Sequence, residues 1–117
     1  MDIRRYDVVM ADLGMTVGSE QGGKRPVIII QNDVGNIHST TTIVIPLSRK
    51  VQKNPTQPTH TLLRKNEENG LKEDSIVLGE QVRVISSQRI LWKIGCITNK
   101  EDKNAIRKAY EANFGEE

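Results

Sequence analysis

Arg25 and Ser48 are the residues whose types and positions best suit joint binding of one phosphate group. An arginine guanidinium is a planar fork that fits two phosphoryl oxygens, and a serine hydroxyl both donates and accepts hydrogen bonds. Lys24 precedes the arginine, and Arg49 and Lys50 follow the serine. This cluster favours an anionic ligand, provided that the fold brings positions 25 and 48 together.

Two apolar runs, Val27–Ile30 and Thr42–Leu47, indicate successive antiparallel strands that would bring them together. The start of one strand then lies opposite the end of the next, so paired residue numbers sum to about 73. Cross-strand neighbours lie roughly 5 Å apart at Cβ, which places Arg25 beside Ser48 at one end of the sheet. The connection 32–40 is longer than a tight hairpin, so the register can slip. In the alternative interpretation both are ordinary rim residues, bonded to a loop carbonyl.

The rest of the chain predicts a mainly β fold. Further strands are expected over Val8–Ala11, His60–Arg64, Ser75–Ile85 and Leu91–Ile97. Gly79, inside the longest run, predicts a bend from one sheet layer to another, as small barrels require. Near the end of the chain the period changes to that of a helix. Thr98-Asn99-Lys100-Glu101 fits a capping box with Thr98 as the cap, and one apolar stripe follows: Ile106, Ala109, Tyr110 and Phe114. A shorter helical turn is expected within Asn32–Ser39.

Composition excludes several classes of protein. The 117 residues correspond to one domain, 1–117. The longest aliphatic run, Val27–Ile30, is far shorter than the roughly 20 residues of a membrane helix. No apolar stretch follows the first five residues, so we expect no secretory signal and a cytoplasmic protein. The single cysteine, Cys96, allows no internal disulfide and no thiolate metal cluster.

Charge is distributed unevenly along the chain. Residues 1–65 hold nine Lys and Arg against five Asp and Glu, whereas residues 66–117 hold eight against ten. A polyanion would therefore be attracted to the first half. Two long loops, Leu13–Lys24 and Ser48–Pro58, lie in that half, and loops this long in a small domain are often functional.

The motifs resemble those of the MazF/PemK family of toxin endoribonucleases. The resemblance covers nearly the whole chain and rests on RYDVVMADL (5–13), GSEQGGKRP (18–26), VIIIQND (27–33), IVIPLS (43–48), PTH (58–60) and LGEQVRVIS (78–86). It implies a small SH3-like β-barrel with an added antiparallel sheet and a C-terminal α-helix, acting as a homodimer. It also implies metal-independent, cofactor-free and sequence-selective cleavage of single-stranded RNA. The implied partner is a cognate MazE-like antitoxin with an acidic, partly disordered tail.

Site residues follow from the same resemblance, residue by residue. The family's key arginine, in its GG-x-RP motif, falls on Arg25, and its usual threonine falls on Ser48. Serine keeps the hydroxyl but loses the methyl group that restricts χ1. Glu20 matches the acidic loop residue, which would orient Arg25 or receive the proton of the 2′-OH. Gln81, from the EQ-x-R motif, looks like a base-contacting position. Further RNA contacts are expected at Ser19, Gln21, Lys24, Arg49, Lys50, Lys53, His60 and Ser75.

The residues also limit the mechanism and leave alternatives open. The only histidines, His38 and His60, do not suggest a two-imidazole mechanism, so Arg25 is expected to stabilise the phosphorane and to donate a proton. Trp92 lies in an apolar run, and Tyr110 and Phe114 belong to the apolar stripe of the predicted helix. Aromatic side chains that could stack on RNA bases are therefore expected to be scarce. Two alternatives remain: a non-enzymatic, gyrase-poisoning toxin of the CcdB kind, or a family member that binds RNA or antitoxin without cleaving.

Overall fold

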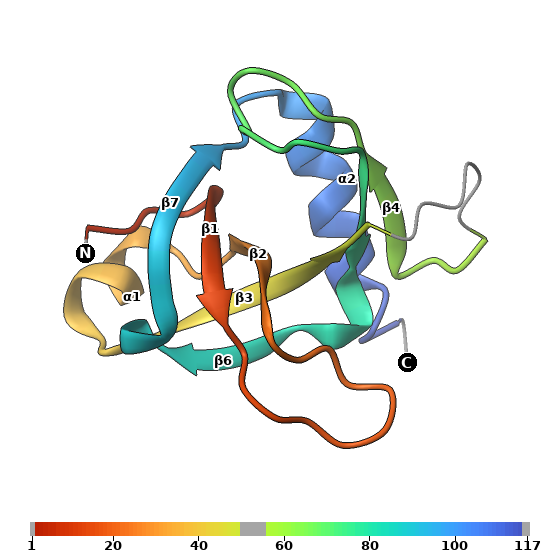
Figure 1. Cartoon of the computed structure of the whole chain (residues 1–117). Helices are drawn as coiled ribbons and strands as arrows, with labels where there is room; N and C mark the ends of the chain where they lie inside the picture. Colours follow the sequence, from red (N-terminus) through yellow and green to blue (C-terminus); the bar gives the residue numbers. More distant parts are fainter. Residues whose placement is uncertain (1, 50–55, 116–117) are drawn as a thin grey trace.

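A computed structural model describes residues 2–49 and 56–115 (Figure 1). Its seven strands are β1 (Asp7–Asp12), β2 (Lys24–Ile29), β3 (Thr41–Ser48), β4 (His60–Leu63), β5 (Ser75–Leu78), β6 (Arg83–Ser86) and β7 (Ile90–Cys96). The helices are α1 (Asp33–His38) and α2 (Lys100–Glu111), with short 3-10 turns η1 (Gly79–Gln81) and η2 (Ser87–Arg89). The predicted class, a mainly β protein with a C-terminal helix, is confirmed.

Strand β3 connects two sheet layers. The strands pair antiparallel in the order β4-β5-β3-β2-β1-β7, and β6 also pairs with β3. Most of β3 lies between β2 and β6, but its last two residues, Leu47 and Ser48, pair with Val77 and Ile76 of β5. Ser48 therefore stands where the chain passes from one layer to the other.

Two apolar clusters explain why the aliphatic runs do not alternate with polar residues. Side chains of a strand point alternately to its two faces. Val9 and Val27 enter the cluster enclosed by β1, β2, β3, β6 and β7, while Val8 and Ile28 enter the cluster beneath α2. All four side chains have no exposed surface. Strands β1 and β2 are thus covered on both faces.

The predicted register of β2 and β3 is confirmed. Val27 pairs with Pro46, Ile28 with Ile45 and Ile29 with Val44. The amide of Ile30 extends the ladder by donating to the carbonyl of Ile43 at 2.9 Å. The predicted turn of helix in the connection is α1, whose cap, Asn32, accepts from the amide of Gly35.

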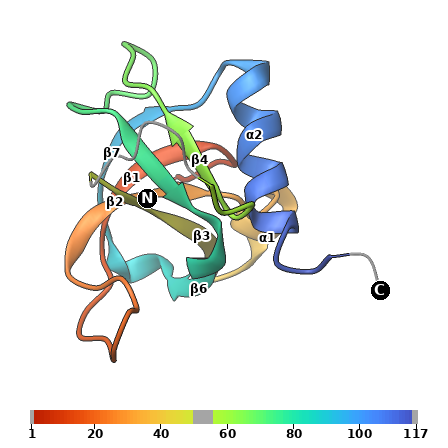
Figure 2. The ribbon, with the colours of Figure 1, turned by 90° about the vertical axis from the view of Figure 1, so that its right-hand side faces the viewer.

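Helix α2 covers β4 and β5 (Figure 2). Its N-cap is Asn99 and not Thr98, because the Asn99 side chain accepts from the amides of Glu101 and Asp102. Ile106 and Ala109 are buried as predicted, but Phe114 is 70% exposed. The prediction for Phe114 is wrong because α2 ends at Glu111, so this side chain no longer follows the helical stripe. Within the described ranges, no helix is long and apolar enough to span a membrane.

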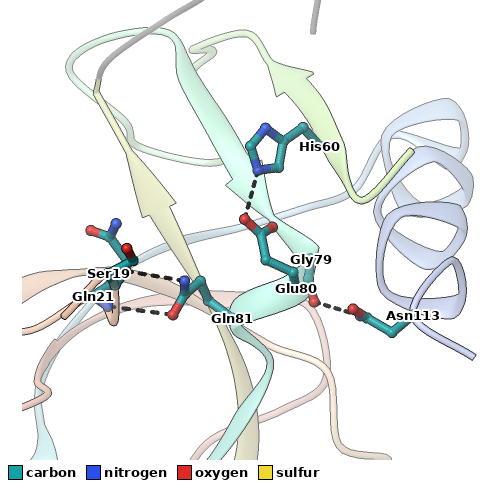
Figure 3. Close-up of polar contacts among 7 residues, drawn as sticks. All are labelled: Ser19, Gln21, His60, Gly79, Glu80, Gln81 and Asn113. Carbon is teal, nitrogen blue, oxygen red and sulfur yellow. Dashed lines mark hydrogen bonds and ion pairs between the residues drawn. The ribbon is translucent and has the colours of Figure 1, made fainter. Parts of the chain in front are cut away.

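The run Ser75–Ile85 bends at Gly79 as predicted, but it forms two strands separated by η1 and not one continuous strand. A Cβ on Gly79 would lie 2.5 Å from the carbonyl oxygens of both Thr59 and Ala109. The side-chain amide of Asn113 donates to the Gly79 carbonyl at 2.8 Å (Figure 3). Close backbone approach from both sides therefore breaks the strand here and requires glycine.

We expect Gly79→Ala to destabilise the fold by about 3 kcal/mol, because a methyl group cannot fit between two backbone segments. Gly35→Ala is the matched control, since its new methyl group meets only the side chain of Gln31. The control should stay within about 1 kcal/mol of the parent chain. Urea unfolding measures both, and equal stabilities of the two variants would contradict the packing described at Gly79.

Candidate active site

Two backbone carbonyls hold the Arg25 side chain. Its Nε donates to the carbonyl of Gly22 and its Nη1 to the carbonyl of Leu47, each at 3.1 Å. These bonds engage two of the five N–H donors of a guanidinium. Arg25 is half-buried at the end of β2, and the Leu47 carbonyl belongs to the residue before Ser48. The structure thus places Arg25 and Ser48 at the same end of the sheet, as predicted.

The alternative interpretation from the sequence also describes part of this geometry, because Arg25 does bond to a loop carbonyl. The two interpretations are compatible, since the bonds use only part of the fork and the side chain stays partly exposed. Ser48 is half-buried as the last residue of β3, paired with Ile76 of β5.

The Gly22-Gly23 pair shapes the loop that presents one of these carbonyls. A Cβ on Gly22 would lie 2.8 Å from the Gly14 carbonyl and from Thr16 Oγ1, and Gly23 has a φ of +70°. The amide of Leu13 donates to the Gly23 carbonyl, and the amide of Gly23 to the Gly14 carbonyl. Glycine is therefore required at both positions for the loop base to close and orient Arg25.

Burial, followed by the positive charge of Arg49, lowers the pKa of Arg25 below its ordinary value. The ordinary pKa of arginine is so high that the side chain stays charged near neutral pH even when its pKa is lowered. Both causes make the guanidinium a better proton donor than a solvated arginine, and a phosphate bound there would relieve the repulsion from Arg49.

Glu20 is exposed, and its polar contacts stay within its own loop. Its Oε1 accepts from the amide of Val17 at 2.7 Å, and its carbonyl accepts from Thr16 Oγ1 at 3.1 Å. In this structure the carbonyls of Gly22 and Leu47, and not Glu20, orient Arg25. The expectation that Glu20 receives a proton stays a prediction.

The Gln81 side chain clasps the same loop (Figure 3). Its Nε2 donates to the Ser19 carbonyl at 3.3 Å, and its Oε1 accepts from the Gln21 amide at 3.4 Å. The two contacts lie on either side of Glu20, so η1 holds the loop segment that carries this carboxylate. Both ends of the amide expected to contact a base thus face loop backbone in this structure.

The other predicted RNA contacts are spread around this end of the molecule. His60 Nε2 lies 2.8 Å from Glu80 Oε2 (Figure 3), so Glu80 occupies one ring nitrogen. Lys24 and Arg49 are exposed, and the buried Ser75 donates to the Glu73 carbonyl at 3.2 Å. Lys50 and Lys53 lie outside the described residues.

Trp92 is the surface feature that the sequence interpretation missed. It is 53% exposed and so does not belong to an apolar core. It lies on β7, an edge strand of the path that pairs with β1, and is opposite Met10. A strand at the edge of a sheet has no neighbouring strand on one side, so some of its apolar side chains can be exposed. A tryptophan in such a strand was the signal in the sequence that could have indicated an exposed aromatic side chain. The expectation that the apolar run covers Trp92 is therefore wrong, while the expected scarcity of stacking platforms stays a prediction.

In the part of the chain that the structure describes, no three His, Cys, Asp or Glu side chains group as metal ligands. At this end of the antiparallel sheet, two backbone carbonyls hold the Arg25 guanidinium, and one of them belongs to the residue before Ser48. These features define a small antiparallel β-protein with cationic side chains at one end of its sheet.

Comparison with known proteins shows the family. Residues 4–112 match the family described as "PemK-like, MazF-like toxin of type II toxin-antitoxin system". The chain belongs to this family of toxins.

Individual relatives agree with this assignment. The chain is 47% identical over 94 residues to "Endoribonuclease EndoA" of Bacillus subtilis, covering 80% of this chain and 79% of that protein. It is 40% identical over 113 residues to "Endoribonuclease MazF" of Staphylococcus saprophyticus, covering 97% and 92%. A solved mycobacterial "Endoribonuclease in complex with its cognate antitoxin" shares the fold, with a TM-score of 0.74 at 20% identity over 97% of this chain and 95% of that one.

If Gln81 clasps the loop, Gln81→Ala should accelerate hydrogen exchange of the Gln21 amide roughly fivefold, since one hydrogen bond contributes about 1 kcal/mol. Gln88→Ala, at an exposed position of η2, is the matched control and should leave exchange at Gln21 unchanged. Exchange resolved by residue, measured by NMR, tests this. The clasp is refuted by an unchanged Gln21 rate in Gln81→Ala.

Proposed function

We propose that this MazF-type toxin cleaves single-stranded RNA at selected sequences without a metal ion, and so inhibits translation and growth. The observation that carries the proposal is the placement of Arg25 and Ser48 at one end of β2 and β3, with the guanidinium held by two carbonyls. Membership of the family and the names of the two curated relatives, both endoribonucleases, support it.

In the proposed reaction the substrate's own 2′-oxygen attacks the adjacent phosphorus. The bond from O2′ to phosphorus forms and the bond to the 5′-oxygen breaks, leaving a 2′,3′-cyclic phosphate and a 5′-hydroxyl. The proton of the 2′-OH passes to a base, and the leaving 5′-oxygen takes up a proton. A pentacovalent phosphorane carries extra negative charge in between, and preorganised charge at that point is the largest catalytic contribution in many enzymes.

Arg25 stabilises the phosphorane through the N–H groups not bonded to Gly22 and Leu47, and its lowered pKa suits it to protonate the leaving oxygen. Ser48 binds a non-bridging oxygen or the 2′-OH. Glu20, in the same loop as Gly22 and exposed, takes the proton of the nucleophile through a water molecule. Lys24 and Arg49 attract the flanking phosphates.

We further propose that the chain acts as a cytoplasmic homodimer with a MazE-like antitoxin as its inhibitor. The family description and the solved mycobacterial relative with its antitoxin support the antitoxin. Val84 and Phe114 are 58% and 70% exposed, which gives a second copy apolar surface to cover. An acidic, disordered tail would compete with RNA for the cationic rim.

Purified protein incubated with a long RNA in EDTA should make discrete cuts with cyclic phosphate ends. Arg25→Ala should lower kcat by about 10²- to 10³-fold, since it removes the main charge stabilisation. Ser48→Ala should lose activity and Ser48→Thr should retain it, because threonine keeps the hydroxyl. Arg107→Ala, on the exposed side of α2, is the control for loss of a surface arginine. Intact RNA together with inhibited gyrase would instead support the CcdB-like function.

The role of Glu20 has its own test. Glu20→Gln should flatten the acid limb of the pH–rate profile, because the carboxylate must be ionised to accept a proton. Thr16→Val is the control for loop stability, since it removes the hydroxyl that donates to the Glu20 carbonyl but keeps the carboxylate. A Glu20→Gln profile that matches the parent would remove Glu20 from the proton path.

A further inference from the structure

A hollow of about 360 Å³ lies against β1, β2 and β7, next to residues 70–75. Its floor contains the apolar side chains of Met10, Pro26, Leu71 and Trp92. A volume of this size lies in the range of about 300–1,000 Å³ that is typical of small-ligand sites. Arg49 and Ser75, which line the hollow, are among the RNA contacts expected above, but no role has been assigned to its apolar floor or to Lys72.

Three of the floor side chains form a row across neighbouring strands of the sheet. Met10 of β1 pairs with Pro26 of β2 on one side and with Trp92 of β7 on the other. Directly opposed residues on a sheet have Cβ atoms roughly 5 Å apart, so the three side chains form a continuous apolar strip. Trp92 is 53% exposed, which leaves much of its ring available for stacking.

The rim of the hollow is cationic. Arg49, Lys72 and Lys93 line it against one carboxylate, that of Glu73. Lys93 Nζ lies 3.2 Å from the Oδ1 of Asp7, whose side chain is only 4% exposed, so Lys93 is partly neutralised and fixed in place. Arg49 and Lys72, both exposed, are the cations best placed to meet a ligand.

The hollow is continuous with the proposed catalytic rim through Arg49. This residue follows Ser48 in the chain and lines the hollow, and after burial its positive charge is the second cause that lowers the pKa of Arg25. Pro26, on the floor, is the residue after Arg25, although the two side chains leave β2 on opposite faces. A flexible strand that passes over this edge of the sheet would contact both places.

We propose that this hollow is a nucleotide subsite for the RNA strand, in which one base stacks on Trp92 and Met10 and its phosphate lies between Arg49 and Lys72. The inference rests on the proposed function, because it extends the path of the same RNA substrate. An aromatic ring beside unpaired cations is the combination by which proteins bind single-stranded nucleic acid. A second copy of this chain packed on the hollow would cover the Trp92 ring. It would also remove water from Arg49 and Lys72 without supplying a negative charge, which is unfavourable.

The fluorescence of Trp92 reports the subsite directly, because the chain has one tryptophan. The probe is an RNA oligonucleotide that spans a mapped cut site and carries a 2′-deoxy sugar there; if no cut is found, a random-sequence RNA replaces it. Saturable quenching by the oligonucleotide is expected, and it should weaken as salt rises, since phosphate contacts release counterions.

Variants then locate the effect. Trp92→Ala and Lys72→Ala should each raise the KM for RNA about tenfold and leave kcat unchanged, because both act on binding away from the reacting atoms. Trp92→Phe should restore most of the affinity. The controls are Val34→Ala, an exposed apolar residue on α1, and Lys108→Ala, an exposed lysine on α2. Neither control should change KM.

The outcomes separate this inference from the proposed function. RNA cleavage with unchanged Trp92 fluorescence overturns the subsite and keeps the function. Quenching that Lys72→Ala weakens, in a protein that cleaves no RNA, keeps the subsite as an RNA-binding surface and overturns the function. Fluorescence that follows protein concentration and a change in oligomeric state, or that responds to an acidic peptide and not to RNA, assigns the hollow to a protein partner and overturns the subsite.

Discussion

The antiparallel register of β2 on β3 is the constraint on which the candidate site depends. It aligns Val27 with Pro46, and thereby brings the start of one strand to the end of the other. A slip of one residue would exchange the two faces of a strand that is covered by apolar clusters on both sides. The hydrogen bond from Arg25 to the Leu47 carbonyl forms only in the observed register. Core packing and the placement of Arg25 near Ser48 are therefore fixed by the same alignment.

The loop between β1 and β2 connects this alignment to the rest of the fold. Gly22 and Gly23 let its base close, and the Gly22 carbonyl then holds Arg25. Gln81 holds the middle of the loop from η1, and η1 itself packs against α2 at Gly79. Segments far apart in the chain thus position one guanidinium. Backbone carbonyls supply much of this positioning, and among the described residues no carboxylate pairs with Arg25.

Positively charged side chains and an apolar surface lie side by side along one edge of the molecule. Burial, followed by the positive charge of Arg49, lowers the pKa of Arg25, so an anion bound at Arg25 would relieve the repulsion between the two guanidinium groups. The hollow beside them adds an exposed tryptophan, which a chain with only four aromatic residues places on the surface and not in the core. A polyanion with stacking bases matches both features, whereas a simple phosphate ion would use only the first.

The sequence alone determined most of the strands, the β2–β3 register and the placement of Arg25 and Ser48 at the same end of the sheet, because aliphatic runs and loop lengths constrain antiparallel pairing strongly. It also located the bend at Gly79. Only the tertiary structure decided the break of that strand into two, since the cause is the backbone of Thr59, just before β4, and of Ala109 in α2. The exposure of Trp92 and Phe114 was likewise undetermined, because periodicity identifies an apolar face and not whether a neighbour covers it. The carbonyls that hold Arg25 belong to positions 22 and 47, and backbone groups leave no signature in side-chain types.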